Sequence, residues 1–322
     1  MKYLLPFSFL LFVFHQSIGQ AYTTQNAHSH NDYEQQTPFH LAYNEGFGSI
    51  EADIHLVDDQ LLVGHDSKSL VKERTLESLY LQPIIAYNQP NRKLQLLIDI
   101  KTDAIKTIDQ LVKLLTKYPG ITNNKNFKIV LSGNAPAEEL FLNYPSFIWF
   151  DGRLNKTYTP AQLAKVALIS EDYYKVIEYK PKWPLDSAAS IKIKSFINKV
   201  HQLGKPVRLW ASPDQPAAWE AFVQWGVDYI NTDKINELSD YLVKRNTSLH
   251  ELPYNRIIHS AGDVVRYGKP DLENHAMDLA NLSDKNLVVV QERYGFFVLD
   301  ILQKKVIDHF RFREQQINKS LS

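Results

Sequence analysis

Eight short apolar segments, separated by stretches with helical periodicity, limit most strongly the folds that this chain can adopt. Nearly every segment runs into a polar or ionisable residue at its carboxyl end. Repeated alternation of strands and helices predicts a parallel sheet, and eight such units in about 225 residues suit a closed (β/α)8 barrel, the TIM barrel of the α/β class. The predicted strands are Gln25–His28, Ser49–Ile54, Gln95–Ile100, Phe127–Leu131, Phe147–Phe150, Ala167–Ser170, Val207–Trp210 and Asp228–Asn231.

Two of the intervening stretches show the helical pattern clearly. Apolar residues recur in them at helical spacing, so each helix can bury one face against the sheet. For the helix at Ala104–Lys117, the predicted buried face is Ile105, Ile108, Leu111, Val112 and Leu115. For the helix at Ala188–Leu203, it is Ile191, Ile193, Phe196, Ile197 and Val200.

The first twenty residues have the pattern of a secretory signal peptide. Lys2 is followed by LLPFSFLLFVF, an apolar run of about eleven residues that is too short to span a bilayer as a helix. Small residues stand at Ser17 and Gly19. We therefore predict that residues 1–20 are a signal peptide and that the protein is exported, to the periplasm or the extracellular space. The absence of cysteine excludes disulfides and thiolate metal sites.

The charge of the chain is balanced, with 36 Lys plus Arg and 36 Asp plus Glu. A net charge of zero gives no long-range attraction to nucleic acid or to an anionic membrane. We therefore expect a small-molecule partner, no nucleic-acid partner and no transmembrane segment in the mature chain.

The strand–helix alternation stops after residue 244, which divides the mature chain into parts. We predict a barrel at residues 21–244, a linker at 245–256 and a β appendage at 257–322. Four short β segments separated by turn residues fit one antiparallel sheet. They read DLANLS, NLVVVQE, GFFVLDI and KKVIDHF. This appendage offers a surface for a docking partner.

A cluster of carboxylates follows the second and third predicted strands. Glu51 and Asp53 are two residues apart in an apolar strand, so both side chains project from the same face. Asp99, in LIDIK, ends the next strand. Neighbouring acids repel one another in a low-dielectric site, and a cation between them relieves the repulsion. Carboxylate oxygens are the ligands of hard ions, so we predict a Ca²⁺ or Mg²⁺ site.

Histidines and a lysine surround these acids in the predicted fold. His28 and His30 end the first strand, and a hairpin at 57–66 with Asp58 and Asp59 in its turn would return His65 to the same rim. Two facing imidazoles can divide the work of acid and base, one taking a proton from an attacking oxygen while the other donates to the leaving oxygen. Lys101 shares a face with Asp99 and could bind a phosphate oxygen or pair with the acids.

The ordered motifs resemble the glycerophosphodiester phosphodiesterase family of the phospholipase-C-like phosphodiesterases. They are A-H, G-x-x-I-E-x-D, L-L-V-x-H-D, I-D-I-K, R-L-W-A and G-V-D-Y-I-N-T-D. HSHNDY with EADIHL further resembles the altered inheritance of mitochondria protein 6 branch. The resemblance implies cleavage of a phosphodiester, on glycerophosphodiester or lysophospholipid-like substrates. It implies Glu51, Asp53 and Asp99 as metal ligands and His65 as one catalytic histidine.

The chain departs from this family at the first strand, where the usual His-Arg-Gly is replaced by HSHN and the phosphate-contacting arginine is missing. The second catalytic histidine is therefore either His28 or His30. Asn31 and Trp210 are predicted substrate contacts, Trp210 because it matches an aromatic residue near the family's seventh strand. Asp233 resembles the family's closing aspartate, with a structural role.

Three alternatives remain at the level of sequence. An amidohydrolase-type barrel shares the His-x-His pair. That class also requires histidines from the fifth and sixth strands, where this chain has Asp151 and Glu171. The missing arginine would suit a barrel that binds metal or ligand without catalysis, with the β tail recruiting a partner. The C-terminal segment resembles one blade of a YVTN-type, lactonase-like β-propeller, or is an unrelated β appendage.

Overall fold

The computed structural model describes residues 22–179 and 185–247, together with five strands between residues 264 and 311. The predicted signal peptide, and the predicted linker from residue 248 onward, lie outside the described residues. Within the described part of the chain, no helix is long and apolar enough to cross a bilayer.

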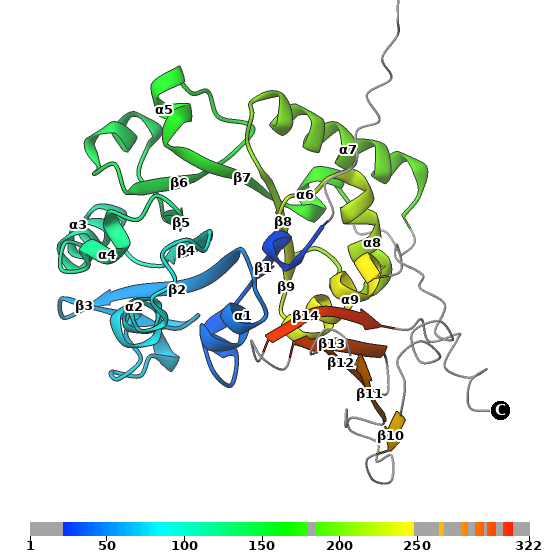
Figure 1. Cartoon of the computed structure of the whole chain (residues 1–322). Helices are drawn as coiled ribbons and strands as arrows, with labels where there is room; N and C mark the ends of the chain where they lie inside the picture. The colour runs from blue at the N-terminus through cyan, green and yellow to red at the C-terminus, as the bar shows by residue number, and fades with distance from the viewer. Residues whose placement is uncertain are drawn as a thin grey trace, which may run out of the picture.

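The core of the molecule is a nearly closed barrel of eight parallel strands. All eight predicted strands are present: β1 (Ala27–Ser29), β2 (Ser49–Val57), β4 (Leu94–Ile100), β5 (Phe127–Gly133), β6 (Ile148–Gly152), β7 (Val166–Asp172), β8 (Val207–Trp210) and β9 (Ile230–Thr232). Their order is β8-β7-β6-β5-β4-β2-β1-β9, so the first strand lies beside the last one (Figure 1).

Closure of the barrel is less complete than predicted. A single bridge joins Arg208 of β8 to Tyr229, the residue before β9, and the amide of Tyr229 donates to the carbonyl of Val207 at 3.0 Å. Strand β9 is only three residues long, which leaves little backbone for a longer ladder.

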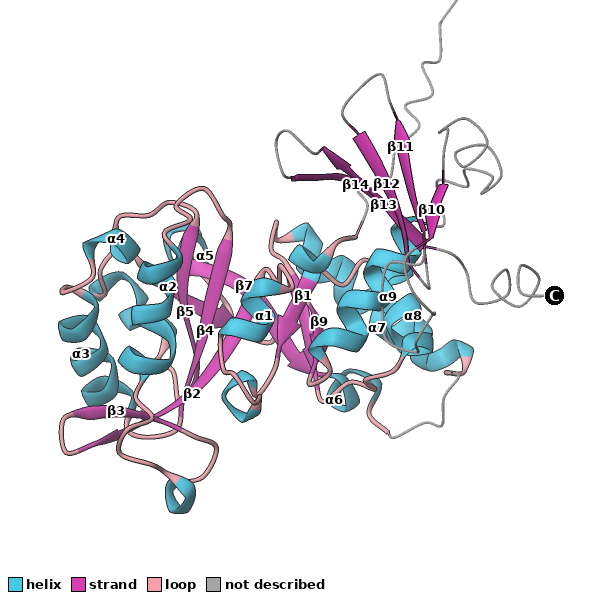
Figure 2. Ribbon diagram, turned by 60° about the horizontal axis from the view of Figure 1, so that its bottom comes forward, coloured by secondary structure: helices cyan, strands magenta, loops and turns pink. Residues whose placement is uncertain are grey.

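Helices cover the outside of the barrel strands (Figure 2). They are α1 (His40–Asn44), α2 (Gln82–Tyr87), α3 (Ala104–Leu115), α4 (Pro119–Thr122), α5 (Pro160–Lys165), α6 (Tyr173–Ile177), α7 (Ser187–Gln202), α8 (Pro216–Trp225) and α9 (Ile235–Thr247). Shorter turns are the 3-10 helices η1 (Thr24–Asn26), η2 (Asp32–Glu34), η3 (Ser67–Ser69) and η5 (Glu138–Asn143), and the π-helical turn η4 (Glu77–Leu81).

The predicted inner faces of α3 and α7 are correct except at one position each. Ile105 is 42% exposed in the first turn of α3, and Ile191 is 66% exposed on α7. Ile191 stands two residues before the buried Ile193, and residues two apart lie about 200° apart around a helix, so both cannot face the barrel. Asp103 and Asp186 begin the two helices by accepting a hydrogen bond from a backbone amide of the first turn.

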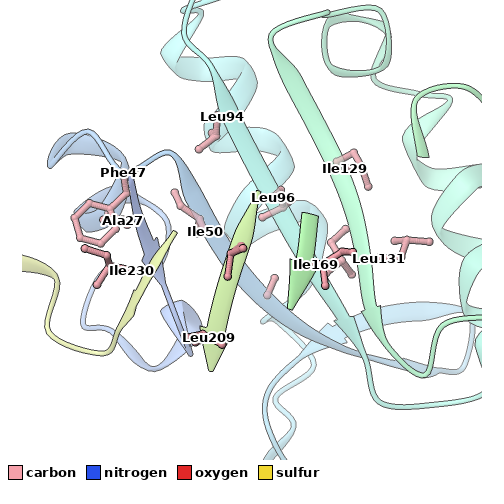
Figure 3. Packing of buried hydrophobic residues seen from close by; sticks show 14 of the residues in the cluster. Ala27, Phe47, Ile50, Leu94, Leu96, Ile129, Leu131, Ile169, Leu209 and Ile230 are labelled. Carbon is pink, nitrogen blue, oxygen red and sulfur yellow. The ribbon is translucent and has the colours of Figure 1, made fainter. Parts of the chain in front are cut away.

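The buried apolar side chains of the barrel strands form two clusters. Side chains such as Ile50, Leu96 and Ile129 belong to the large cluster that packs between sheet and helices (Figure 3). Leu97, Val130, Ala167 and Leu168 form a second, smaller cluster. Since Leu97 lies one residue after Leu96, it projects from the opposite face, into the barrel, and Asp99 projects on the same side. The interior is therefore apolar in its middle and acidic at its carboxyl end.

The predicted hairpin after β2 is confirmed. Strand β3 (Gln60–Val63) pairs antiparallel with β2, and Asp58 and Asp59 both have positive φ, as a two-residue type I′ turn requires. The amide of Gly64 then donates to the carbonyl of Asp53 at 3.2 Å. The hairpin thus returns the chain to the carboxyl end of β2.

The C-terminal strands form an antiparallel sheet in chain order: β10 (Val264–Arg266), β11 (Asp278–Leu282), β12 (Leu287–Glu292), β13 (Gly295–Asp300) and β14 (Lys305–Arg311). Four of them match the predicted β segments. The sequence analysis missed β10, because a three-residue strand is too short to show an alternating pattern.

Candidate active site

The three predicted metal ligands meet at the barrel mouth, the rim formed by the carboxyl ends of the parallel strands. Each of Glu51, Asp53 and Asp99 offers an oxygen that lies within 4.8 Å of those of the other two. Asp53 and Asp99 are direct neighbours in the β2–β4 register, and Glu51 lies two residues earlier on the same face. Glu51 and Asp53 are 3% and 2% exposed. Three close carboxylates, two of them buried, fit a hard divalent cation.

A buried arginine that the sequence analysis did not assign to the site supports Glu51 from across the barrel. Arg208 on β8 is 3% exposed, its Nη2 lies 3.3 Å from Glu51 Oε2, and its Nε donates to Asn231 Oδ1 at 2.9 Å. Burial alone would raise the pKa of Glu51, but the Arg208 guanidinium and His28 hold it well below its usual range. The signal was in the sequence: an arginine between Val207 and Leu209, in an apolar strand, must be paired when buried.

Asp99 and Lys101 form the other side of the acidic cluster. Lys101 Nζ lies 2.9 Å from Asp53 Oδ2 and 3.3 Å from Asp99 Oδ1. Burial, together with repulsion from Asp53 and Glu51, raises the pKa of Asp99 to about 6 despite this lysine. Lys101 therefore pairs with the acids in this structure, and these two contacts leave the third N–H of its ammonium group for another acceptor.

The two histidines at the end of β1 have different surroundings. His28 is fully buried, with Nδ1 2.7 Å from Ser49 Oγ and Nε2 3.3 Å from Glu51 Oε2, and burial lowers its pKa to about 3. The side chain of His30 is 28% exposed, with Nδ1 2.8 Å from Asp233 Oδ1 and Nε2 3.9 Å from Glu51 Oε2. Burial would lower the pKa of His30, but Asp233 and Glu51 raise it above its ordinary value. His28 is thus neutral and enclosed, whereas His30 is accessible.

His65 reaches the same rim from the hairpin, as predicted. Its side chain is 58% exposed, and its Nδ1 lies 3.2 Å from Asp53 Oδ2. His30 and His65 therefore share one arrangement, in which Nδ1 contacts a carboxylate and Nε2 is the nitrogen left for other partners. A carboxylate on one ring nitrogen fixes the tautomer and the orientation of an imidazole.

The HSHNDY segment is held by a buried aspartate beneath it. Asp32 is fully buried and accepts hydrogen bonds from Ser29 Oγ at 2.8 Å, the amide of Phe39 at 2.5 Å and Tyr80 Oη at 3.1 Å. Burial raises the pKa of Asp32 to about 6, against the lowering effect of these donors. This network fixes the turn that follows β1, in which Asn31 has a φ of 46°.

The two predicted substrate contacts lie at the rim. The side-chain nitrogen of Asn31 is 3.1 Å from His30 Nδ1, and its oxygen lies 2.8 Å from Tyr33 Oη. Trp210 is partly buried at the end of β8, with Lys175 Nζ 5.9 Å from its ring centre. Contact of Asn31 and Trp210 with substrate stays a prediction.

The wall made by β5, β6 and β7 does not resemble an amidohydrolase site. Asp151 pairs with Arg153 at 2.9 Å and accepts a hydrogen bond from Ser132 Oγ at 2.9 Å. Among the residues that the structure describes, the group suited to a metal consists of Glu51, Asp53 and Asp99, without histidine. The geometry therefore favours the carboxylate site over the His-x-His site.

Two family models match the chain. A model of the AIM6-like phosphodiesterase domain matches residues 16–89, and a model of the glycerophosphoryl diester phosphodiesterase family matches residues 206–235. The first match includes Glu51, Asp53 and His65, and the second includes Arg208 and Asp233. Both matches lie outside the C-terminal sheet, so they give no support to its resemblance to a propeller blade. That sheet also has five strands, where a blade has four.

Curated relatives match about two thirds of the chain. The chain is 28% identical over 261 residues to an altered inheritance of mitochondria protein 6 homolog from Arthroderma benhamiae, across 66% of this chain and 82% of that protein. It is 26% identical over 300 residues to altered inheritance of mitochondria protein 6 from Kluyveromyces lactis, across 67% of this chain and 72% of that protein.

Solved structures with a similar layout include a glycerophosphodiester phosphodiesterase from Parabacteroides distasonis. That structure has a TM-score of 0.46 and 16% identity, across 68% of this chain and 97% of its own. A putative glycerophosphoryl diester phosphodiesterase from Agrobacterium tumefaciens has a TM-score of 0.45 and 12% identity, across 68% of this chain and 97% of its own. The two family models and the curated relatives confirm the resemblance that the motifs predicted.

Proposed function

From this similarity to AIM6-like and glycerophosphodiester phosphodiesterase proteins, we propose that the chain is an exported, metal-dependent phosphoric diester hydrolase. The substrate class is a glycerophosphodiester or a lysophospholipid-like head group. The observation that carries the proposal is the convergence of Glu51, Asp53 and Asp99 within 4.8 Å, beside two accessible histidines that each contact a carboxylate through Nδ1.

The acids would hold a Ca²⁺ or Mg²⁺ ion, since their donor atoms are all carboxylate oxygens. When bound, the ion supplies neutralisation of the phosphate charge and polarisation of its oxygens. Arg208 keeps Glu51 ionised, so this ligand is ready to bind without losing a proton. Lys101, which pairs with Asp53 and Asp99, has a third N–H that can contact a phosphate oxygen.

The histidines would move the protons of the reaction. One imidazole takes the proton of the attacking oxygen as that oxygen forms a bond to phosphorus, and the other gives a proton to the alcohol oxygen as its bond to phosphorus breaks. The attacking oxygen belongs to water or to a neighbouring hydroxyl of the substrate, which would give a cyclic phosphate. We assign these roles to His30 and His65, because His28 is fully buried behind Glu51.

Turnover by the purified full chain tests the proposal. We expect hydrolysis of at least one member of a panel of glycerophosphodiesters and lysophospholipids in the presence of Ca²⁺, Mg²⁺ or Mn²⁺, and its loss with a chelator. His65→Asn and Asp99→Asn should each lower kcat by a factor of about 10² to 10⁴. His201→Asn is the matched control, since His201 is a partly exposed histidine paired with Asp228 outside the site.

Three results would contradict this proposal. Undiminished activity of His65→Asn would exclude its role in proton transfer. Turnover that is insensitive to a chelator would exclude the metal. Cation binding without turnover on any diester would instead favour the barrel that binds metal without catalysis.

A further inference from the structure

We propose that Tyr33 is a positioning residue that holds His65 and Asp53 together and links them, through Asn31, to His30. This inference rests on the proposed function, because it assigns the two histidines to one reaction. Tyr33 belongs to the HSHNDY segment, whose tyrosine the sequence analysis did not assign to the site. Its hydroxyl stands between the acidic cluster and both accessible histidines.

The first half of the link joins β2 to the hairpin. Tyr33 Oη lies 2.8 Å from Asp53 Oδ2 and 3.4 Å from His65 Nδ1, and these two atoms are themselves 3.2 Å apart. The three groups therefore form a closed triangle. His65 needs such a restraint, since its ring is 58% exposed and it follows a hairpin.

The second half of the link runs to the end of β1. Tyr33 Oη also lies 2.8 Å from Asn31 Oδ1, and the side-chain nitrogen of Asn31 lies 3.1 Å from His30 Nδ1. His30 in turn contacts Asp233 through the same Nδ1, at 2.8 Å. Tyr33 and Asn31 thus lie between His65 Nδ1 and His30 Nδ1. In each ring, Nε2 is the nitrogen proposed to take part in the reaction.

Proton counting assigns the direction of the central bond. The Tyr33 hydroxyl has one proton and faces two acceptors at equal distance, the Asp53 carboxylate and the Asn31 amide oxygen. A carboxylate accepts more strongly than an amide, so the proton belongs to Asp53 Oδ2. The contact with Asn31 is then a hydrogen bond with the Asn31 amide group turned over, so that its nitrogen donates to Tyr33 Oη and its oxygen accepts from His30 Nδ1, which also donates to Asp233. That oxygen then accepts from Tyr33 and Lys101 and lies beside His65, which leaves the second oxygen of Asp53 for a cation.

Tyr33 can act as a restraint because it is itself fixed. Only 4% of it is exposed, and Arg74 donates a hydrogen bond to its backbone carbonyl. The neighbouring Asp32 anchors the same turn through three donors. The fixed Tyr33 hydroxyl can therefore orient the exposed imidazole of His65 beside it.

The experiment removes only the hydroxyl, with Tyr33→Phe in the full chain. Tyr43→Phe is the matched control, because Tyr43 is 5% exposed and therefore about as buried as Tyr33. Its hydroxyl donates to Gln89, on the amino-terminal side of β4 and away from the site. The first measurement is the ¹⁵N NMR spectrum of the imidazoles without added metal, with His65 and His30 identified from His65→Asn and His30→Asn. The second is kcat and KM on whichever diester the wild type hydrolyses.

We expect Tyr33→Phe to shift the ring-nitrogen resonances of His65, and to lower kcat by a factor of about 10 to 100 with KM changed by less than about threefold. Tyr43→Phe should leave both measurements at the wild-type values. An unchanged His65 spectrum in Tyr33→Phe would overturn the inference, as would unchanged kcat. If the wild type hydrolyses no diester, the proposed function fails, and the spectrum alone decides whether Tyr33 positions His65.

Discussion

At the scale of single residues, burial decides which of two neighbouring histidines can take part in chemistry. His28 and His30 are two residues apart, so an extended backbone would place both on the same side, and sequence spacing cannot separate them. His28 ends in a closed contact with Ser49 and Glu51, whereas His30 lies at the rim beside Asp233. The same amino acid therefore supports a predicted metal ligand at one position and presents a partly exposed ring at the other.

This difference predicts opposite effects of two substitutions. His30→Asn should lower kcat by a factor of about 10² to 10⁴ and leave the unfolding free energy nearly unchanged, since its ring is partly exposed. His28→Ala should cost about 2 to 5 kcal/mol of stability, because it opens a cavity and removes one hydrogen-bond partner each from Ser49 and Glu51. Urea unfolding and turnover measure the two effects. A fully active His30→Asn protein would exclude His30 as the second histidine.

The buried Asp32 predicts a pH-dependent loss of stability. Its pKa rises from 3.8 to about 6 in the folded state, so the folded protein binds this proton more tightly than the unfolded chain does. The resulting stabilisation is complete below about pH 4 and is lost as pH rises through about 6. The rise in the pKa of Asp32 corresponds to about 3 kcal/mol of unfolding free energy. The Asp32→Asn variant lacks this titrating proton, so its stability should not change with pH for this reason.

The measurement is the unfolding free energy of both proteins in urea between pH 4 and 7.5. The difference, wild type minus Asp32→Asn, should fall across this range. Parallel curves would show that the donors from Ser29, Phe39 and Tyr80 keep Asp32 ionised throughout.

At the scale of elements, strand register and tight backbone contacts build the acidic cluster. The β2–β4 pairing places Asp53 beside Asp99, and the β4–β5 pairing places Asp99 beside Ser132. The next residue of β5, Gly133, passes directly against the Asp99 side chain. An added Cβ at Gly133 would lie 2.0 Å from Asp99 Oδ1 and 2.6 Å from the Ile100 carbonyl.

Gly133→Ala should therefore displace the Asp99 carboxylate and weaken cation binding. We expect Mn²⁺ affinity, measured by calorimetry, to fall by a factor of about 10 to 100. Gly204→Ala is the control, because Gly204 has the same φ of +68° with open space around an added Cβ. Both variants should lose about 1 to 2 kcal/mol of stability from the left-handed backbone. Gly133→Ala should lose more, because its Cβ also meets the Ile100 carbonyl, and it alone should lose affinity. Equal affinities in the two variants would exclude crowding of Asp99.

At the scale of the whole molecule, the barrel is complete before the C-terminal sheet begins. Its eight strands end with β9, and α9 follows to Thr247, three residues beyond the predicted boundary at 244. The acids, both histidines, Tyr33 and Arg208 all lie within this part.

A chain that ends after Thr247 should keep the urea midpoint of the barrel and its cation affinity. The physical reason is that every strand pair of the barrel and its surrounding helices remain. Denaturation monitored by tryptophan fluorescence and Mn²⁺ calorimetry measure the two properties. Aggregation or loss of cation binding would show instead that the C-terminal residues are needed by the barrel.

The sequence alone determined the strands, the hairpin and the acids, because these follow from local periodicity. An alternating strand places Glu51 and Asp53 on one face, and the carboxyl ends of parallel strands meet at one rim, so the convergence with Asp99 was predictable. Four of the five C-terminal strands were predictable for the same reason. The exposed Ile191 shows where the local pattern fails. Ile191 and Ile193 are two residues apart, so they cannot lie on the same face of a helix.

Only the tertiary structure decided how the site is completed. Arg208 reaches Glu51 across the barrel, Tyr33 joins Asp53 to His65, and Asp233 pairs with His30 at the rim. Each of these contacts joins residues from different strands or loops through side-chain length and burial. Periodicity gives the face on which a side chain lies, but distances across the barrel depend on closure, which no single stretch of sequence contains.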